Sequence, residues 1–147
     1  MKKLNLILLS LLISGLFISC ASNSEIPTNL TSAQLIQKAQ NAYDKAAYKE
    51  SINYYQTTIN RYGTDLSIYV EATYEIGHIY LRTKKYEKAY QYFSELKDIY
   101  STASFGSLPT AYNKLADIGI SQIPEKKYAA IIKNTSENTT SEQDSEQ

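Results

Sequence analysis

Residues 70–100, VEATYEIGHIYLRTKKYEKAYQYFSELKDIY, are the stretch that decides how this chain folds. Apolar and small side chains recur three and four residues apart on both sides of a short turn at residues 83–85, which is the spacing of one face of a helix. These two faces are formed by Ile76, Gly77, Tyr80, Tyr86, Ala89, Phe93 and Leu96. The pattern predicts two antiparallel helices that approach closely at Gly77 and Ala89, with aromatic rings filling the space on either side.

The same pattern recurs before and after this helical hairpin, which indicates a repeat array. Tyr48, Ser51, Tyr55 and Tyr62 align with Tyr86, Ala89, Phe93 and Tyr100 of the second helix. Ala111, Leu115 and Ala116 align with Ala72, Ile76 and Gly77 of the first helix. The sequence therefore predicts an all-α fold, in which the flanking helices cover residues 33–45, 48–61, 110–121 and 125–133, with a bridge at residues 64–67.

The first residues have the composition of a targeting segment rather than of a folded domain. Lys2 and Lys3 precede an apolar run over residues 4–18, which is shorter than the roughly 20 residues that span a membrane. The run ends in Phe17-Ile18-Ser19-Cys20, which resembles a bacterial lipobox. The resemblance implies a lipoprotein signal peptide over residues 1–19, cleavage before Cys20 and acylation of that cysteine.

The remaining sequence divides by composition into a tether, a helical domain and a tail. Residues 20–30 would hold the lipidated Cys20 and a polar tether, residues 31–133 the helices, and residues 134–147 a tail without apolar side chains that we expect to be disordered. Cys20 is the only cysteine, so no disulfide can form within the chain. An ordinary secretory signal with an incidental cysteine is the alternative for the N-terminus.

The run Ile76-Gly77, Tyr80, Tyr86, Ala89, Phe93 and Leu96 resembles a tetratricopeptide repeat (TPR). The resemblance implies a short right-handed stack of antiparallel helix hairpins, here two repeats and a partial third. The segment AQNAYDKAAYKESINYYQ, residues 39–56, is similar to BamD-like lipoproteins of the outer-membrane β-barrel assembly machinery and to TPR proteins of the Tol-Pal system. The chain departs from that family in having fewer repeats and in lacking the usual proline after the second helix.

In TPR arrays the first helices of successive repeats line a concave groove that contacts partner segments. Carried over by position, the resemblance implies a partner-binding groove formed by Glu71, Tyr74, His78, Arg82, Gln40, Asp44, Asn113 and Asp117. Spacing of four along one helix places Tyr74, His78 and Arg82 in a row. The alternative is that these residues are the polar face that every amphipathic helix has.

The sequence contains no recognisable catalytic constellation. His78 is the only histidine and lies within a predicted helix, so a Ser-His-Asp site has no suitable base. The five glycines are scattered, and acidic residues do not cluster with His78 at metal-ligand spacing. We therefore expect no enzyme activity, cofactor or metal. The basic run at residues 82–85 is either a solvated turn or a contact for lipid or an acidic partner.

These patterns together predict a lipid-anchored module for protein–protein interaction in the bacterial cell envelope, on the periplasmic side of the outer membrane. Ala21 after Cys20 favours the outer membrane under the enterobacterial sorting pattern. The family resemblance implies β-barrel assembly components as partners, and a formal net charge of zero gives no reason to expect nucleic acid. A surface-exposed lipoprotein that binds extracellular ligands is the alternative, and the apolar ends of a short array could also favour self-association.

Overall fold

The computed structural model describes residues 25–104 and 106–143, so the predicted signal peptide and Cys20 lie outside the described residues. Within these ranges the fold contains six helices and no strand, which confirms the all-α prediction. The helices are α2 (Ser32–Asp44), α3 (Tyr48–Tyr62), α4 (Leu66–Arg82), α5 (Tyr86–Thr102), α6 (Ala111–Ser121) and α7 (Glu125–Gln143). None of the helices in the described ranges is long and apolar enough to cross a membrane.

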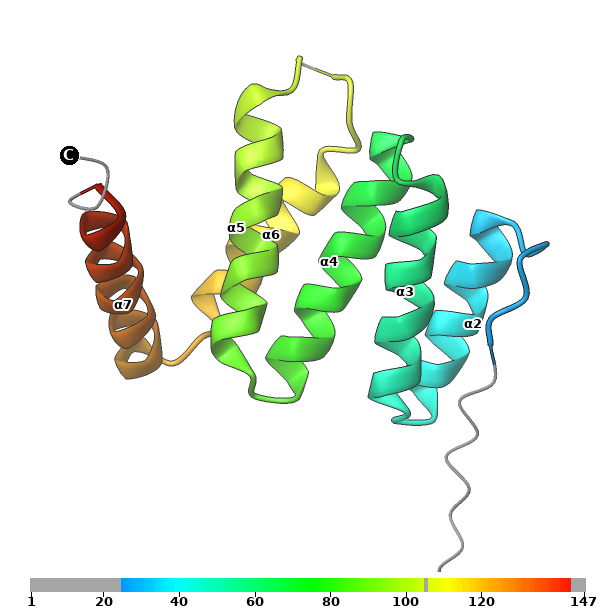
Figure 1. The fold of residues 1–147 in the computed structure, drawn as a ribbon, viewed down its shortest axis with the longest axis horizontal. Coiled ribbons are helices and arrows are strands. Elements are labelled where there is room, and N and C mark those ends of the chain that lie inside the picture. The colour runs from blue at the N-terminus through cyan, green and yellow to red at the C-terminus, as the bar shows by residue number, and fades with distance from the viewer. Residues whose placement is uncertain (1–24, 105, 144–147) are drawn as a thin grey trace, which may run out of the picture.

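Helices α2 to α5 pack in chain order as two successive hairpins, and α6 packs against both α4 and α5 (Figure 1). Helix α7 lies at the far end of this stack from α2 and contacts α5. The architecture is therefore a helical stack with a repeat-like arrangement.

The turns of the two hairpins have the same backbone geometry. Ala46, between α2 and α3, and Lys84, between α4 and α5, both have left-handed φ angles, of 56° and 60°. In each turn the next amide donates back into the helix that has just ended, from Ala47 N to Ala42 O over 2.9 Å and from Lys85 N to Tyr80 O over 2.8 Å. This is the Schellman arrangement that ends many helices. The two hairpins therefore match in the backbone geometry of their turns as well as in their sequence pattern.

The core is centred on the ring of Phe93 in α5, which is fully buried and lies between a glycine of α4 and a glycine of α6. A Cβ atom on Gly77 would lie 2.8 Å from Cε1 of this ring, and one on Gly119 would lie 2.5 Å from both Cε2 and Cζ. Both glycines lie within helices, where alanine would be intrinsically more favourable. Only the absence of a side chain lets the three helices share one ring.

The described part of the tether is held against the first hairpin. The guanidinium of Arg61, in the last turn of α3, donates to the carbonyls of Pro27 and Ile26, at 2.6 and 3.0 Å. The hydroxyl of Tyr62 donates to the carbonyl of Leu30 at 2.6 Å. Residues 26–30 are thus attached to the C-terminal end of α3, although composition alone predicted a free polar tether.

Two helix boundaries differ from the sequence prediction. Helix α4 begins at Leu66 rather than at residue 70, because the Asp65 side chain accepts a hydrogen bond from the amide of Ser67 at 2.9 Å and caps the helix. Helix α7 continues to Gln143, whereas the sequence predicted an end at Lys133 and a disordered tail from residue 134. Thr135 returns a hydrogen bond to the carbonyl of Ile131, and Lys133 and Glu137 form an i,i+4 ion pair that supports the extension.

Gly119→Ala should destabilise the fold, although alanine has the better helix propensity. The new Cβ must displace the Phe93 ring or separate α5 from α6, and overpacking of this kind costs about 1–3 kcal/mol. Thermal and urea unfolding of the variant measure this loss.

The double variant Gly119→Ala/Phe93→Leu is the control for this mechanism, because leucine lacks the ring atoms that the new Cβ would meet. We expect the double variant to lose less stability than the two single variants lose together. Losses that add to within about 0.5 kcal/mol would contradict the contact as the cause.

Candidate functional site

A continuous row of aromatic rings crosses four helices of the stack. The ring centroids of Tyr48 and Tyr43 are 5.7 Å apart, and those of Tyr43 and His78 are 5.8 Å apart. His78 stacks on Tyr74 at 6.0 Å with an interplanar angle of 6°, and Tyr74 meets Tyr112 at 5.6 Å. All five side chains are only partly buried, so each keeps some surface open to solvent. We call this set, Tyr43, Tyr48, Tyr74, His78 and Tyr112, the aromatic face.

The aromatic face is positioned by the same packing that holds the core together. Tyr74 and His78 are four residues apart on α4 and therefore lie one above the other. The opposite side of α4 carries Ile76 and Gly77, both buried against the rest of the stack. Tyr74 also touches the Phe93 ring, with centroids 5.9 Å apart, so the face and the core share a direct contact.

Arg82 lies at the end of the row formed by Tyr43 and Tyr48. Its Nε donates to the hydroxyl of Tyr48 at 3.1 Å, and its guanidinium carbon lies 5.9 Å from the centroid of the Tyr43 ring. Both contacts use favourable interactions of a planar cation with phenol side chains. Arg82 thus links the end of α4 to the turn between α2 and α3.

Two half-buried carboxylates lie beside the rings. Glu71 and Glu75 are four residues apart on α4, and neither forms an ion pair with another described residue. Burial raises the pKa of Glu71, and burial together with the charge of Glu71 raises the pKa of Glu75. Burial is the main cause that raises the pKa of Tyr112 to about 12, and the charges of Glu71 and Glu75 raise it further.

The surroundings of His78 favour its neutral form. Burial is the main cause that lowers its pKa, and the positive charge of Arg82 lowers it further. The neutral ring can stack on tyrosine and can offer one donor and one acceptor to a partner. The aromatic face therefore combines four phenols with one imidazole, and two carboxylates and one guanidinium lie at its border.

The structure places the eight predicted groove residues in three different settings. Tyr74, His78 and Arg82 of α4 take part in the row of rings, and Glu71 lies close enough to affect Tyr112. Gln40 and Asp44 of α2 are exposed, and the charge of Asp44 acts on Tyr43. All of these six residues except Gln40 have a contact with the rings of the aromatic face or an electrostatic effect on them.

Asn113 and Asp117 of α6 are engaged elsewhere. The ammonium of Lys97 in α5 donates to Oδ1 of Asn113 at 2.7 Å and forms an ion pair with Asp117 at 2.9 Å. These contacts join α6 to α5 and take no part in the row of rings. The residue of α6 that joins the row of rings is Tyr112, the neighbour of Asn113.

Sequence reasoning missed Tyr43, Tyr48, Tyr112 and Glu75. Alignment of repeats finds equivalent positions on successive helices, whereas the ring contacts are made by side chains that point from one helix toward the next. Tyrosine is long enough to bridge that distance, so a tyrosine next to an aligned position was the available signal. Glu75 could have been found from its spacing of four from Glu71.

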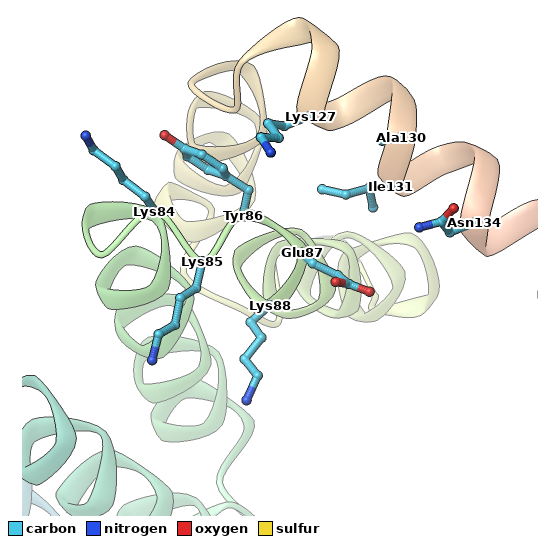
Figure 2. A pocket seen from close by; sticks show the side chains of 9 residues that line it. All are labelled: Lys84, Lys85, Tyr86, Glu87, Lys88, Lys127, Ala130, Ile131 and Asn134. Atoms are coloured by element: carbon cyan, nitrogen blue, oxygen red, sulfur yellow. The ribbon is translucent and has the colours of Figure 1, made fainter.

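A separate cleft of about 650 Å³ lies between the start of α5 and α7 (Figure 2). Tyr86, Ala130 and Ile131 line it, together with polar residues that include four lysines. Figure 2 shows Lys85 and Lys88 pointing away from α7, and their ammonium groups lie 5.9 and 5.4 Å from the centroid of the Tyr80 ring. Lys85 and Lys88 therefore do not point into this cleft toward α7.

Metal coordination has no candidate position in the ranges that the structure describes. No three histidine, cysteine, aspartate or glutamate side chains among those residues lie close enough together to hold an ion.

Comparison with known proteins gives one relative and no family. The chain is similar to an uncharacterized protein of Treponema pallidum (strain Nichols), with 32% identity over 108 residues. The matched segment covers 71% of this chain and 43% of the relative, so the chain spans less than half of the relative's length. No protein-family model and no solved structure matches the sequence.

Glu75→Gln should stabilise the protein at pH 8 more than at pH 4. The folded state raises the pKa of Glu75, so its stabilising contribution is complete below the unfolded pKa near 4.5 and is lost as the pH rises through the folded value. Glutamine removes this dependence and also removes the repulsion from Glu71. Melting temperatures of both proteins across this pH range measure the difference.

His78→Gln is the matched control of opposite sign. Its lowered pKa means that the contribution of His78 is complete above pH 6.5 and is lost as the pH falls through the folded value. The stability of His78→Gln relative to the native chain should therefore rise as the pH is lowered. An advantage of Glu75→Gln that stays constant from pH 4 to pH 8 would contradict a desolvated carboxylate at that position.

Proposed function

We propose that this chain is a lipid-anchored, TPR-type interaction module of the bacterial cell envelope, which binds protein partners through the aromatic face without catalysing a reaction. The observation that carries the proposal is the row of five partly exposed rings across α2, α3, α4 and α6. Rings that only fill a core would be fully buried, whereas these five rings remain partly open to solvent.

The chemistry of this face suits a protein partner. Tyrosine offers a large contact area at a low cost in side-chain entropy, since it has few rotatable bonds, and its hydroxyl can still hydrogen-bond at an interface. Residues of this type and arginine provide much of the binding energy at protein interfaces. Tyr43, His78 and Tyr74 lie in the middle of the row and therefore form the centre of such a contact, with Arg82 at its Tyr48 end.

The TPR-type assignment is supported by the equivalence of the two hairpins. Small residues occupy the same position of the second helix in each hairpin, Ser51 in α3 and Ala89 in α5, and both are fully buried. The two hairpin turns also share the left-handed residue described above, at Ala46 and Lys84. The finer assignment, to an outer-membrane β-barrel assembly complex, rests on the sequence resemblance of residues 39–56.

A lipid on Cys20 would hold the stack close to the membrane. Arg61 binds the carbonyls of Ile26 and Pro27, so the chain between the lipid and this attachment point has only about six residues. Fully extended backbone spans about 3.3–3.6 Å per residue, which limits the separation to roughly 20 Å. The end of the stack formed by the start of α2 and the end of α3 would then lie nearest the membrane.

Cys20→Ser tests the anchor. Without the sulfur no lipid can be attached, and the protein should move from the membrane fraction to the soluble fraction after cell disruption. A variant that stays with the membrane to the same extent as the native chain would remove the lipoprotein from the proposal.

Tyr43→Ala and Tyr112→Ala test the aromatic face. Each should weaken co-purification with β-barrel assembly components from crosslinked membranes, because loss of a tyrosine that anchors an interface costs about 2 kcal/mol. Tyr90→Ala, which removes a partly buried tyrosine whose ring contacts Tyr128 instead, should leave the yield unchanged. Equal yields from all three variants would contradict binding through this face.

A further inference from the structure

We propose that the aromatic face binds its protein partner through a lysine or arginine side chain of that partner, held by Glu71 and Glu75 and by the rings of Tyr74 and Tyr112. This inference rests on the proposed function, because it names the chemistry of the partner segment that the same face would take.

The first argument is that the two carboxylates are placed at a cost to the fold. Both are partly buried on α4, they are one helical turn apart, and the charge of one acts against the charge of the other. Buried like charges destabilise a folded protein unless a cation and hydrogen bonds compensate them. Among the described residues no lysine, arginine or histidine pairs with either group. A partner cation between Glu71 and Glu75 would provide the missing compensation.

The second argument comes from the charges on the surrounding helices. Asp44 of α2 adds a third negative charge, which acts on Tyr43 and Tyr55 together with Glu75. Arg82 lies two helical turns beyond Glu75, roughly 10 Å along α4, and is engaged with Tyr43 and Tyr48. Lys97 of α5 is engaged with Asn113 and Asp117. Arg82 of the same helix and Lys97 of the neighbouring helix are thus both engaged in other contacts.

The third argument is that the neighbouring rings favour a cation. A lysine or arginine head group within about 6 Å of a tyrosine ring gains a further attraction from the ring electrons. Glu71 precedes Tyr74 by three residues on α4, so the two side chains are neighbours on the helix surface. The rings of Tyr74 and Tyr112 are 5.6 Å apart and inclined at 45°. This chain already uses such contacts, with Arg82 over Tyr43 and Lys88 over Tyr80.

The same features disfavour other partner segments. An acidic segment would bring its charge against Glu71, Glu75 and Asp44. An apolar segment would bury the two carboxylates further and leave them unpaired, which costs more than the contact gains. Charge complementarity therefore selects a basic segment, with its cation at the Glu71 end of the face and away from Arg82.

Titration of the full chain in detergent, followed by NMR, tests the inference. The probe is N-acetyl-arginine methylamide, and its matched control is the citrulline analogue, which has nearly the same shape and no charge. We expect the arginine probe to shift the signals of residues 71–78 and Tyr112 at pH 8, with at least tenfold weaker binding of the citrulline probe. Equal binding of the two probes, or stronger binding of N-acetyl-glutamate methylamide, would overturn the inference.

The double variant Glu71→Gln/Glu75→Gln should weaken binding of the arginine probe at least tenfold while the protein stays folded. Glu87→Gln, at an exposed position of α5, is the control and should bind as the native chain does. Unchanged binding by the double variant, with its fold verified by circular dichroism, would also overturn the inference.

Failure of this inference can be distinguished from failure of the proposed function. If Tyr43→Ala and Tyr112→Ala lose the partner while Glu71→Gln/Glu75→Gln keeps it, the face binds protein without a cation and only the inference is wrong. If the arginine probe binds at α4 but no variant of the face affects partner capture, the basic-segment chemistry stands and the proposed partner complex is wrong.

Discussion

The structure depends on one aromatic ring that three helices share. Phe93 of α5 lies against Gly77 of α4 and Gly119 of α6, and a single methyl group at either glycine would occupy space that the ring now fills. This contact sets how closely α4 and α6 approach α5. It thereby also sets the positions of Tyr74 and Tyr112, which meet on the surface formed by α4 and α6. The packing of the core and the geometry of the aromatic face are parts of one arrangement.

Helix α4 connects the core to the aromatic face. One of its sides packs Ile76 and Gly77 into the core. The other side carries Glu71, Tyr74, Glu75 and His78, and its rings contact Tyr43 of α2 and Tyr112 of α6. Within the described residues the carboxylates of this second side have no cationic partner, and the pKa values of Glu71, Glu75 and His78 are all shifted by burial. This desolvation of charged groups is what motivates the proposal that a partner completes their surroundings.

The sequence predicted the helices well, because their apolar residues repeat with helical spacing and the repeats align. It placed α4 four residues too short, since the capping hydrogen bond of Asp65 lies outside that spacing, and it ended α7 too early. On the aromatic face, alignment found Tyr74, His78 and Arg82 but selected Asn113 instead of Tyr112. The reason is physical: contacts between helices depend on the direction of each side chain, and a one-residue shift rotates that direction by about 100°. The ring contacts therefore could not be obtained from position alone.

Photo-crosslinking in living cells tests the central claim, that the aromatic face is where a protein partner binds, most directly. A photoreactive amino acid at Asp44, exposed at the border of the face, should give a covalent adduct with a second protein. The same amino acid at Asn53, exposed on α3, serves as the comparison and should give none. Adducts at Asn53 alone, or equal adducts at both positions, would contradict the account.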